Sequence, residues 1–290
     1  MTLQELFLAL DRFWAARGCA LLQPHDGALG AAAMHPGAFF RALGPEPWRA
    51  AYAQPTRRPA DGRYARSPDR AQRYYSYLVV LKPSPDDAQE VYLESLSQLG
   101  IPLRRHDVRF VDDDWESASL GAAGVGWEVR LDGMAVTRFA YLQQMASIAL
   151  RPASVAITYG AERLAMLLQG VGSLWDLEWA PGIRYGEIGL HAEASWCRYQ
   201  FEVADTERLS AWLAAAEAEA TAALAAGLVV PAYDCALRCA HALSLLESRG
   251  ALGTTERATA VERVRRLARQ CAEGYLAERE RLGFPLMQPA

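Results

Sequence analysis

The chain has 290 residues, of which 51% are hydrophobic and 22% charged, and its formal net charge is −4. These values describe a globular protein with a substantial core, and they exclude a disordered chain, a collagen-like repeat and a small disulfide scaffold. A slightly negative charge with both signs interspersed also argues against a protein that coats nucleic acid through its overall charge.

The N-terminal third is predicted to alternate short strands with one helix. Apolar residues at helical spacing predict a helix over 3–17, and a short strand is expected at 20–23. Residues 25–47 are rich in Gly, Ala and Pro, which favours an ordered loop lining a site over a packed helix. Residues 50–55 and 73–81 are typical of strands, and the arginine-rich segment between them is expected to be a long, mobile, positively charged hairpin loop.

The middle of the chain is predicted to form antiparallel hairpins. A helix over 86–99 precedes a strand at 107–111, and the turn Asp132-Gly133 joins two further strands. Another strand is expected at 153–159, followed directly by a helix. Antiparallel hairpins with helices outside the sheet indicate an α+β fold.

The last third of the chain has helical periodicity throughout. Helices are expected over 206–226, 232–249 and 254–282, separated by Gly and Pro. The change in pattern predicts two parts, a mixed α+β domain over 1–204 and an all-helical domain over 205–290.

Charged side chains cluster in two predicted hairpins, and together they could form a polyphosphate site. Guanidinium groups bind phosphate in a bidentate way, and carboxylates can hold Mg²⁺. Lys82 is the only lysine, so any anion site would be built from arginine. By themselves, the clusters are equally well described as a solvated loop and a solvated turn. The side chains are Arg57, Arg58, Arg63, Arg66 and Arg70 in the first hairpin and Asp112, Asp113, Asp114, Glu116 and Glu128 in the second.

Common catalytic and nucleotide-binding motifs are absent from the sequence. It contains no G-x-x-x-x-G-K-[ST], no G-x-G-x-x-G after a strand, no G-x-S-x-G and no H-E-x-x-H. The five cysteines form no C-x-x-C pair, so neither a disulfide framework nor a zinc ribbon is predicted.

Several long segments nevertheless resemble one known family. FVDDDWESASLGAAGVGWEVRLDGMAVT, ITYGAERLAMLLQG and the segment around the arginine loop are similar to the α subunit of bacterial tetrameric glycyl-tRNA synthetase, and the resemblance runs from residue 1 to about residue 286. It implies a class II synthetase core with an antiparallel sheet flanked by helices, usually a homodimer, and a helical C-terminal region that meets a separate β subunit. It also implies an ATP-dependent ligase that forms an acyl-adenylate with Mg²⁺.

The resemblance assigns roles to individual charged and aromatic residues. It implies that Arg57, Arg58 or Arg63 holds the α-phosphate and the attacking carboxylate, and that Arg163 lies against the ATP. Tyr75 or Tyr77 would support the adenine, and two carboxylates would contact Mg²⁺ or the ribose. These carboxylates are Glu116 and Glu128.

The departures from the family pattern lie where the amino acid is expected to bind. The family typically has Glu where this chain has Ala135 and Ala156, and Gln where it has Ser76 and Leu78. Ala33 replaces a threonine. Loss of a buried carboxylate opposite an ammonium costs on the order of 2–5 kcal/mol of binding. The expected pocket residues are Ala33, Ser76, Leu78, Trp115, Ala135, Ala156 and Thr158.

Three functions follow from this comparison. The first is a diverged enzyme that activates a different small carboxylate or amino acid and passes it to a non-standard acceptor, with tRNA involved indirectly or not at all. The second is an ordinary glycyl-tRNA synthetase α subunit working with a β subunit, and the third is a catalytically inactive binding or regulatory subunit. A cytoplasmic location without membrane contact is expected, because no apolar run reaches the ~18–20 residues that span a bilayer.

Overall fold

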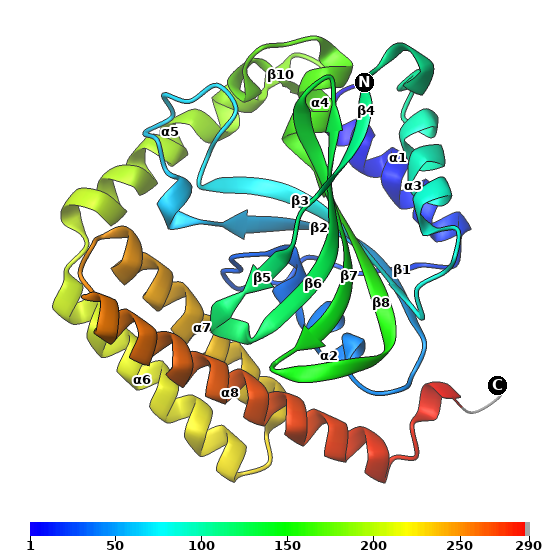
Figure 1. The fold of residues 1–290 in the computed structure, drawn as a ribbon. Helices are drawn as coiled ribbons and strands as arrows, with labels where there is room; N and C mark the ends of the chain where they lie inside the picture. The colour runs from blue at the N-terminus through cyan, green and yellow to red at the C-terminus, as the bar shows by residue number, and fades with distance from the viewer. Residues whose placement is uncertain (288–290) are drawn as a thin grey trace.

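A single curved sheet forms the centre of the molecule (Figure 1). The computed structural model describes residues 1–287. Its main sheet has the strand order β1-β2-β3-β8-β7-β6-β4, with β5 paired to β6, and all pairs are antiparallel except β1 with β2. The strands are β1 (Ala20–Leu21), β2 (Trp48–Arg57), β3 (Arg73–Lys82), β4 (Val108–Asp112), β5 (Trp115–Ser117), β6 (Ala122–Leu131), β7 (Met134–Met145) and β8 (Ile148–Gly160), with a separate pair β9 (Glu178–Ala180) and β10 (Ile183–Arg184).

Helices cover both faces of the sheet. On one face, α1, α3 and α4 bury apolar residues against β3 and β8, and on the other, α2, α7 and α8 do so. A third apolar cluster joins α6, α7 and α8 to one another, and Figure 1 shows these three helices side by side. The helices are α1 (Leu3–Ala16), α2 (Pro36–Ala42), α3 (Ala88–Gln98), α4 (Ala161–Gln169), α5 (Tyr185–Arg198), α6 (Thr206–Ala225), α7 (Val229–Ser248) and α8 (Thr254–Arg281).

This architecture confirms the predicted α+β class, with an antiparallel sheet flanked by helices and a helical C-terminal region. The predicted turn at Asp132 and Gly133 joins β6 to β7, and both residues have positive φ. Because α7 and α8 pack on the sheet as well as on α6, the helices share a core with the first 204 residues. The proposed boundary at residue 204 stays a prediction.

The prediction of a loop over 25–47 was wrong in its second half. The chain forms α2 there, because Phe39 and Phe40 are buried against Tyr233 of α7, with the Phe39 ring stacked on it and the Phe40 ring tilted to it. His35 caps this helix by accepting a hydrogen bond at Nδ1 from the Gly37 N–H, at 2.8 Å. A segment rich in Gly, Ala and Pro, which is typical of a loop, therefore contains a short buried helix.

A second hairpin, between β7 and β8, was also missed. Its turn residues Ala146 and Ser147 both have positive φ, at 53° and 59°. The sequence carries no Asn-Gly or Asp-Gly signal there, and residues such as Ala rarely adopt this conformation. The sequence pattern therefore does not predict the turn.

The arginine-rich hairpin loop is tied to the neighbouring helices rather than isolated in solvent. The Tyr64 hydroxyl donates to Glu202, the Trp175 indole donates to the Ser67 carbonyl, and the Gln200 amide donates to the Pro59 carbonyl. These contacts hold the loop against the short helical turn Leu174–Asp176 and the π-helical turn Tyr199–Val203 that follows α5. The expectation of a mobile loop is corrected accordingly.

Phe13 and Trp14 of α1, together with Tyr52 of β2, are large apolar residues that could contact a second copy of the chain only if they were exposed. All three side chains are at most 9% exposed and belong to the internal core. They are therefore not available as contact residues in this conformation. Among the described residues, none of the helices is both long and apolar enough to cross a membrane.

Candidate active site

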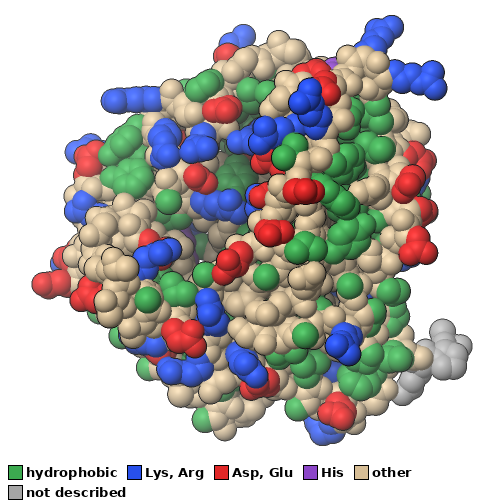
Figure 2. All heavy atoms as spheres, viewed as in Figure 1, with side chains coloured by type: hydrophobic (Ala, Val, Ile, Leu, Met, Phe, Trp, Pro, Cys, Tyr) green, Lys and Arg blue, Asp and Glu red, His purple; other side chains and the backbone are tan. Residues whose placement is uncertain are grey.

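A cavity of about 350 Å³ lies against β3, β8, β7 and β6, on the face that also carries α2. We call it the sheet cavity. Directly paired residues on neighbouring strands share a face, and the row Thr158, Arg138 and Glu128 crosses three strands along its wall. Figure 2 shows this side of the molecule hollowed, with arginine and carboxylate side chains gathered around the hollow.

Two arginines enter the sheet cavity from different elements. Arg58 follows β2, donates from Nε to the Gly30 carbonyl at 3.0 Å, and lies over the ring of Tyr74 with 5.8 Å between Cζ and the ring centre. Arg163 lies in the first turn of α4 and donates from Nη1 to the Ala135 carbonyl, also at 3.0 Å. Each guanidinium keeps further N–H groups that these bonds do not use. The two side chains can therefore hold an anion from two sides.

Glu162, next to Arg163, is a buried carboxyl group that lines the same cavity. Its Oε1 accepts a hydrogen bond from the Tyr75 N–H at 2.7 Å and another from the Tyr185 hydroxyl at 2.9 Å. Burial raises the pKa of Glu162 to about 7, although both bonds and the nearby Arg163 act in the opposite direction. The bonds join α4 to β3 and α5, so Glu162 fixes the position of the helix that carries Arg163.

The remaining charged wall contains Glu128 and Arg138. The Glu128 carboxylate accepts a hydrogen bond from Arg130 Nε at 2.7 Å, and Arg138 forms an ion pair with Asp113. No group of three or more His, Cys, Asp or Glu side chains placed to hold a metal ion occurs within residues 1–287. Mg²⁺ bound with a nucleotide needs only one or two protein carboxylates beside the phosphate oxygens, and Glu128 fits that requirement.

The floor of the sheet cavity is uncharged and small. Ala33, Ala135, Ala140 and Ala156 line it together with Ser76. Ala156 pairs with Ala140 across β8 and β7. Trp115 closes one side and is only 8% exposed. The positions where the family pattern has carboxylates are thus alanines facing the cavity.

The structure places several of the expected site residues elsewhere. Tyr75 and Tyr77 lie on the opposite face of β3: Tyr75 contacts Phe7 and Trp179, and the buried Tyr77 hydroxyl donates to Asp11 at 2.8 Å. Neither ring lines the sheet cavity, so the expectation that one of them supports an adenine stays a prediction that this geometry does not favour.

Arg57, Arg63, Glu116 and Leu78 also lie outside the cavity lining. Arg57 lies over the ring of Trp196, with 5.5 Å between Cζ and the ring centre, and Arg63 donates to carbonyls of its own loop. Glu116 is exposed, and Leu78 lies on the same face of β3 as Ser76 but is fully buried in the apolar cluster there. Of the three candidate loop arginines, only Arg58 reaches the cavity.

Sequence reasoning missed Tyr74 and Arg138, which line the sheet cavity, whereas Arg70, which lines it too, was among the five arginines of the predicted polyphosphate site. Tyr74 could have been found, because residues two apart on a strand share a face and Ser76 was already assigned to the pocket. Arg138 pairs with Thr158 across two strands, and that register becomes visible only in the folded sheet.

The antiparallel sheet has one cavity arginine, Arg58, directly after strand β2 and another, Arg163, in helix α4 directly after strand β8. This arrangement is expected of an aminoacyl-tRNA synthetase-like ligase. The model of the family described as glycyl-tRNA synthetase alpha subunit matches residues 3–280, and the chain belongs to that family.

Similar solved structures include two of pyrrolysyl-tRNA synthetase from Desulfitobacterium hafniense. The first has 14% sequence identity and a TM-score of 0.43, and the match covers 63% of this chain and 76% of that one. The second has 13% identity and a TM-score of 0.42, with coverage of 62% and 73%.

Proposed function

We propose that the protein activates a small carboxylate with ATP, forming an acyl-adenylate and pyrophosphate, and that its substrate is not free glycine in the usual pose. One observation carries this proposal. The guanidinium groups of Arg58 and Arg163 line the same cavity as a floor of alanines at positions 33, 135 and 156.

The proposed reaction needs no nucleophile from the protein. A carboxylate oxygen of the substrate attacks the α-phosphorus of ATP, a new O–P bond forms, and the bond to pyrophosphate breaks. The protein aligns the reactants and stabilises the negative charge of the transition state, which is the work expected of Arg58 and Arg163. Glu128 is the carboxylate that would hold Mg²⁺, which when bound would supply further positive charge at the phosphates.

The alanine floor sets the proposed substrate preference. A substrate ammonium would find no carboxylate at Ala135 or Ala156, and glycine has little other surface to offer. A substrate with more apolar surface, or without a free α-ammonium, loses less binding free energy at this floor than glycine does. A protein with such a changed substrate is better explained as a paralogue of the synthetase, which would pass the acyl group to a non-standard acceptor.

A specific observation also supports an ordinary glycyl-tRNA synthetase α subunit. The family model covers nearly the whole chain, and the described family is the α subunit of a two-subunit enzyme. In that case a β subunit would supply tRNA recognition. For either function we propose that the protein is cytoplasmic and forms a homodimer. Light scattering at micromolar concentration tests the homodimer.

The experiment is ATP–pyrophosphate exchange with the purified protein and a panel of small amino acids and other carboxylic acids. Exchange supported by at least one apolar or non-ammonium substrate, and lost in Arg58→Ala, supports the proposal. Absence of exchange with every substrate, with and without a β subunit, would favour an inactive binding or regulatory subunit.

A further inference from the structure

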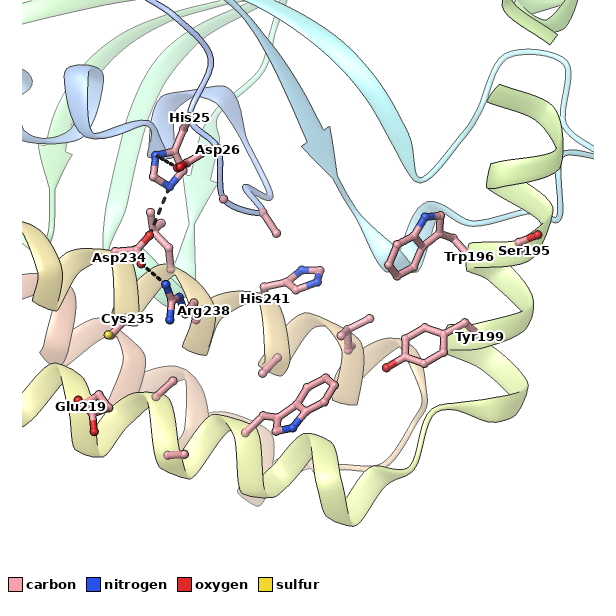
Figure 3. Close-up of a pocket in the computed structure, with 18 residues that line it drawn as sticks. His25, Asp26, Ser195, Trp196, Tyr199, Glu219, Asp234, Cys235, Arg238 and His241 are labelled. Atoms are coloured by element: carbon pink, nitrogen blue, oxygen red, sulfur yellow. Dashed lines mark ion pairs between the residues drawn. The ribbon is translucent and has the colours of Figure 1, made fainter. Parts of the chain in front are cut away.

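A second cavity, of about 1030 Å³, lies between α5, α6, α7 and the segment 25–28 (Figure 3). We call it the helix cavity. It extends along α7 from Asp234 to Leu245, and the eleven residue-to-residue steps of helix at ~1.5 Å each span about 16 Å. No step of the proposed adenylation uses it.

The two ends of the helix cavity differ in chemistry. Figure 3 shows His25, Asp26, Asp234, Arg238 and Glu219 at one end, and Trp196 and Tyr199 at the other, with His241 between them. The aromatic end continues into an apolar wall of alanine and leucine side chains from α6 and α7. The cavity therefore has one polar, charged end and one aromatic end.

The charged end carries an excess of carboxylates. Asp234 forms an ion pair with Arg238, at 2.7 Å between Oδ2 and Nη2, and the exposed Asp26 lies 3.8 Å from His25 Nδ1. Neither Asp26 nor Glu219 has a guanidinium partner among residues 1–287. His241 adds no positive charge near neutral pH, because burial and the nearby Arg57 lower its pKa to about 4. A cation is the charge that this end attracts.

His25 offers an additional polar contact at the same end. Its Nε2 is buried and has no hydrogen-bond partner among the described residues, and it lies 3.6 Å from Asp234 Oδ1. The backbone N–H of His25 donates to the Gln54 side chain at 2.8 Å, which fixes the residue at the cavity wall. A buried polar atom of this kind is normally paired in the occupied site.

The aromatic end can contact the apolar part of a ligand whose cationic group lies at the charged end. Trp196 and Trp212 both line the cavity, and 57% of the Trp212 surface is exposed despite its size. Trp212, Ala215, Ala216 and Glu219 lie on one face of α6, since they are three, four and seven residues apart. One helix face thus supplies both an aromatic surface and a carboxylate.

The helix cavity shares a wall with the sheet cavity. Gly27 and Ala28 line the helix cavity, and residues 31–33 of the same segment line the sheet cavity. Between them, the Leu29 carbonyl accepts a hydrogen bond from the Arg57 N–H at 2.7 Å, and the Gly30 carbonyl accepts one from Arg58. Ligands in the two cavities would therefore lie on either side of one nine-residue segment.

We propose that the helix cavity binds an elongated small-molecule amine, with its ammonium group near Asp234 and Glu219 and its apolar or aromatic body against Trp196, Tyr199 and Trp212. Aromatic faces and carboxylates both favour an organic cation. The same carboxylates repel a polyphosphate backbone, so a nucleic-acid strand is not the occupant. This site goes beyond the proposed adenylation and does not depend on it.

The test measures binding of 4-phenylbutylamine to the nucleotide-free protein by saturation-transfer NMR. Two matched probes replace the ammonium, 5-phenylpentanoate with a carboxylate and 4-phenyl-1-butanol with a neutral hydroxyl. We expect the amine to bind most tightly and its affinity to fall as salt is raised. Equal or tighter binding of the carboxylate or the alcohol would overturn the proposal.

Surface variants then locate the binding. Glu219→Gln and Trp212→Ala, both at exposed positions, are expected to weaken amine binding about three- to tenfold. Glu207→Gln on the same helix and Leu228→Ala after it are exposed and outside the cavity, so they should bind the amine as the unmodified protein does. If the lining variants behave like these controls, the site is wrongly placed. Because no nucleotide is present, failure here is independent of whether the protein activates a carboxylate.

Discussion

Ala156 on β8 lies directly opposite Ala140 on β7, and both side chains line the sheet cavity. A carboxylate at position 156 would therefore extend into the space where a substrate is proposed to bind. The pairing also explains why no neighbouring side chain replaces the missing charge. Position 140 on the adjacent strand is equally small.

Ala156→Glu is expected to increase glycine-dependent pyrophosphate exchange. A new ion pair between the substrate ammonium and this carboxylate, stabilising by ~2 kcal/mol or more, corresponds to about 30-fold or more in affinity. Ala149→Glu places the same residue at an exposed position on the same strand and should leave glycine use unchanged. Equal exchange by the two variants would contradict the assignment of position 156 to the substrate pocket.

Ser76→Gln should add to the effect of Ala156→Glu, whereas Leu78→Gln should not. Ser76 lines the cavity, but Leu78 is fully buried in the apolar cluster beneath it. An amide at position 78 would lose solvent contact without a partner, at a cost of about 1–3 kcal/mol. Urea unfolding of Leu78→Gln should show this loss, and an increase in glycine use by this variant would place residue 78 in the site.

Arg58→Ala and Arg163→Ala should each lower exchange with the best substrate by about 10²–10³-fold, because each removes one charged contact to the transition state. Arg63→Ala is the matched control, since Arg63 lies outside the cavity lining and donates to the carbonyls of Ala60 and Gly62 in its own loop. Circular dichroism should show the same fold for all three. A larger loss in Arg63→Ala than in Arg58→Ala would contradict the placement of the loop arginines.

Glu162 should make the stability of the protein depend on pH. Its folded-state pKa of about 7 lies above the ordinary value of 4.5, so the fold favours the protonated form. The stabilising contribution is full below pH ~4.5 and is lost as the pH rises through about 7, a change of about 3 kcal/mol. Glu162→Gln keeps an oxygen for Tyr75 and Tyr185 but does not titrate. The unfolding free energy of the unmodified protein minus that of Glu162→Gln should therefore fall from pH 4.5 to 8. A constant difference would contradict the raised pKa of Glu162.

Lys82 should be required for the position of α2. Its buried ammonium donates to the carbonyls of Arg41 and Leu43, at 3.1 and 2.7 Å, where that helix ends. Lys82→Ala removes both bonds and leaves a cavity, and a loss of about 2–5 kcal/mol is expected in urea unfolding. Leu8→Ala, at an exposed position, should change stability by less than about 1 kcal/mol, and a similar loss in both variants would argue against this role.

Much of the fold was predictable because strand and helix periodicities are local. The hairpin at Asp132 and Gly133 carries its own turn signal, whereas the turn at Ala146 and Ser147 uses residues that seldom adopt positive φ. The short helix α2 depends on packing against Tyr233, almost 200 residues later in the chain. Local signals could not reveal that contact.

The site was only partly predictable for the same reason. Ser76 lines the sheet cavity, and strand alternation applied to its neighbours would have chosen Tyr74 over Tyr75 and Tyr77. Which loop arginine enters the cavity depends on the bond between Arg58 and Gly30, across 28 residues. The helix cavity combines segment 25–28 with helices beyond residue 195, and no local pattern brings these together.

The most direct test of the central claim is glycine-dependent ATP–pyrophosphate exchange by the unmodified protein, measured with and without a β subunit. The uncharged floor at Ala135 and Ala156 predicts little or no exchange with glycine, alongside clear exchange with at least one more apolar or non-ammonium carboxylate. Efficient activation of glycine would contradict this account and identify the chain as an ordinary glycyl-tRNA synthetase α subunit.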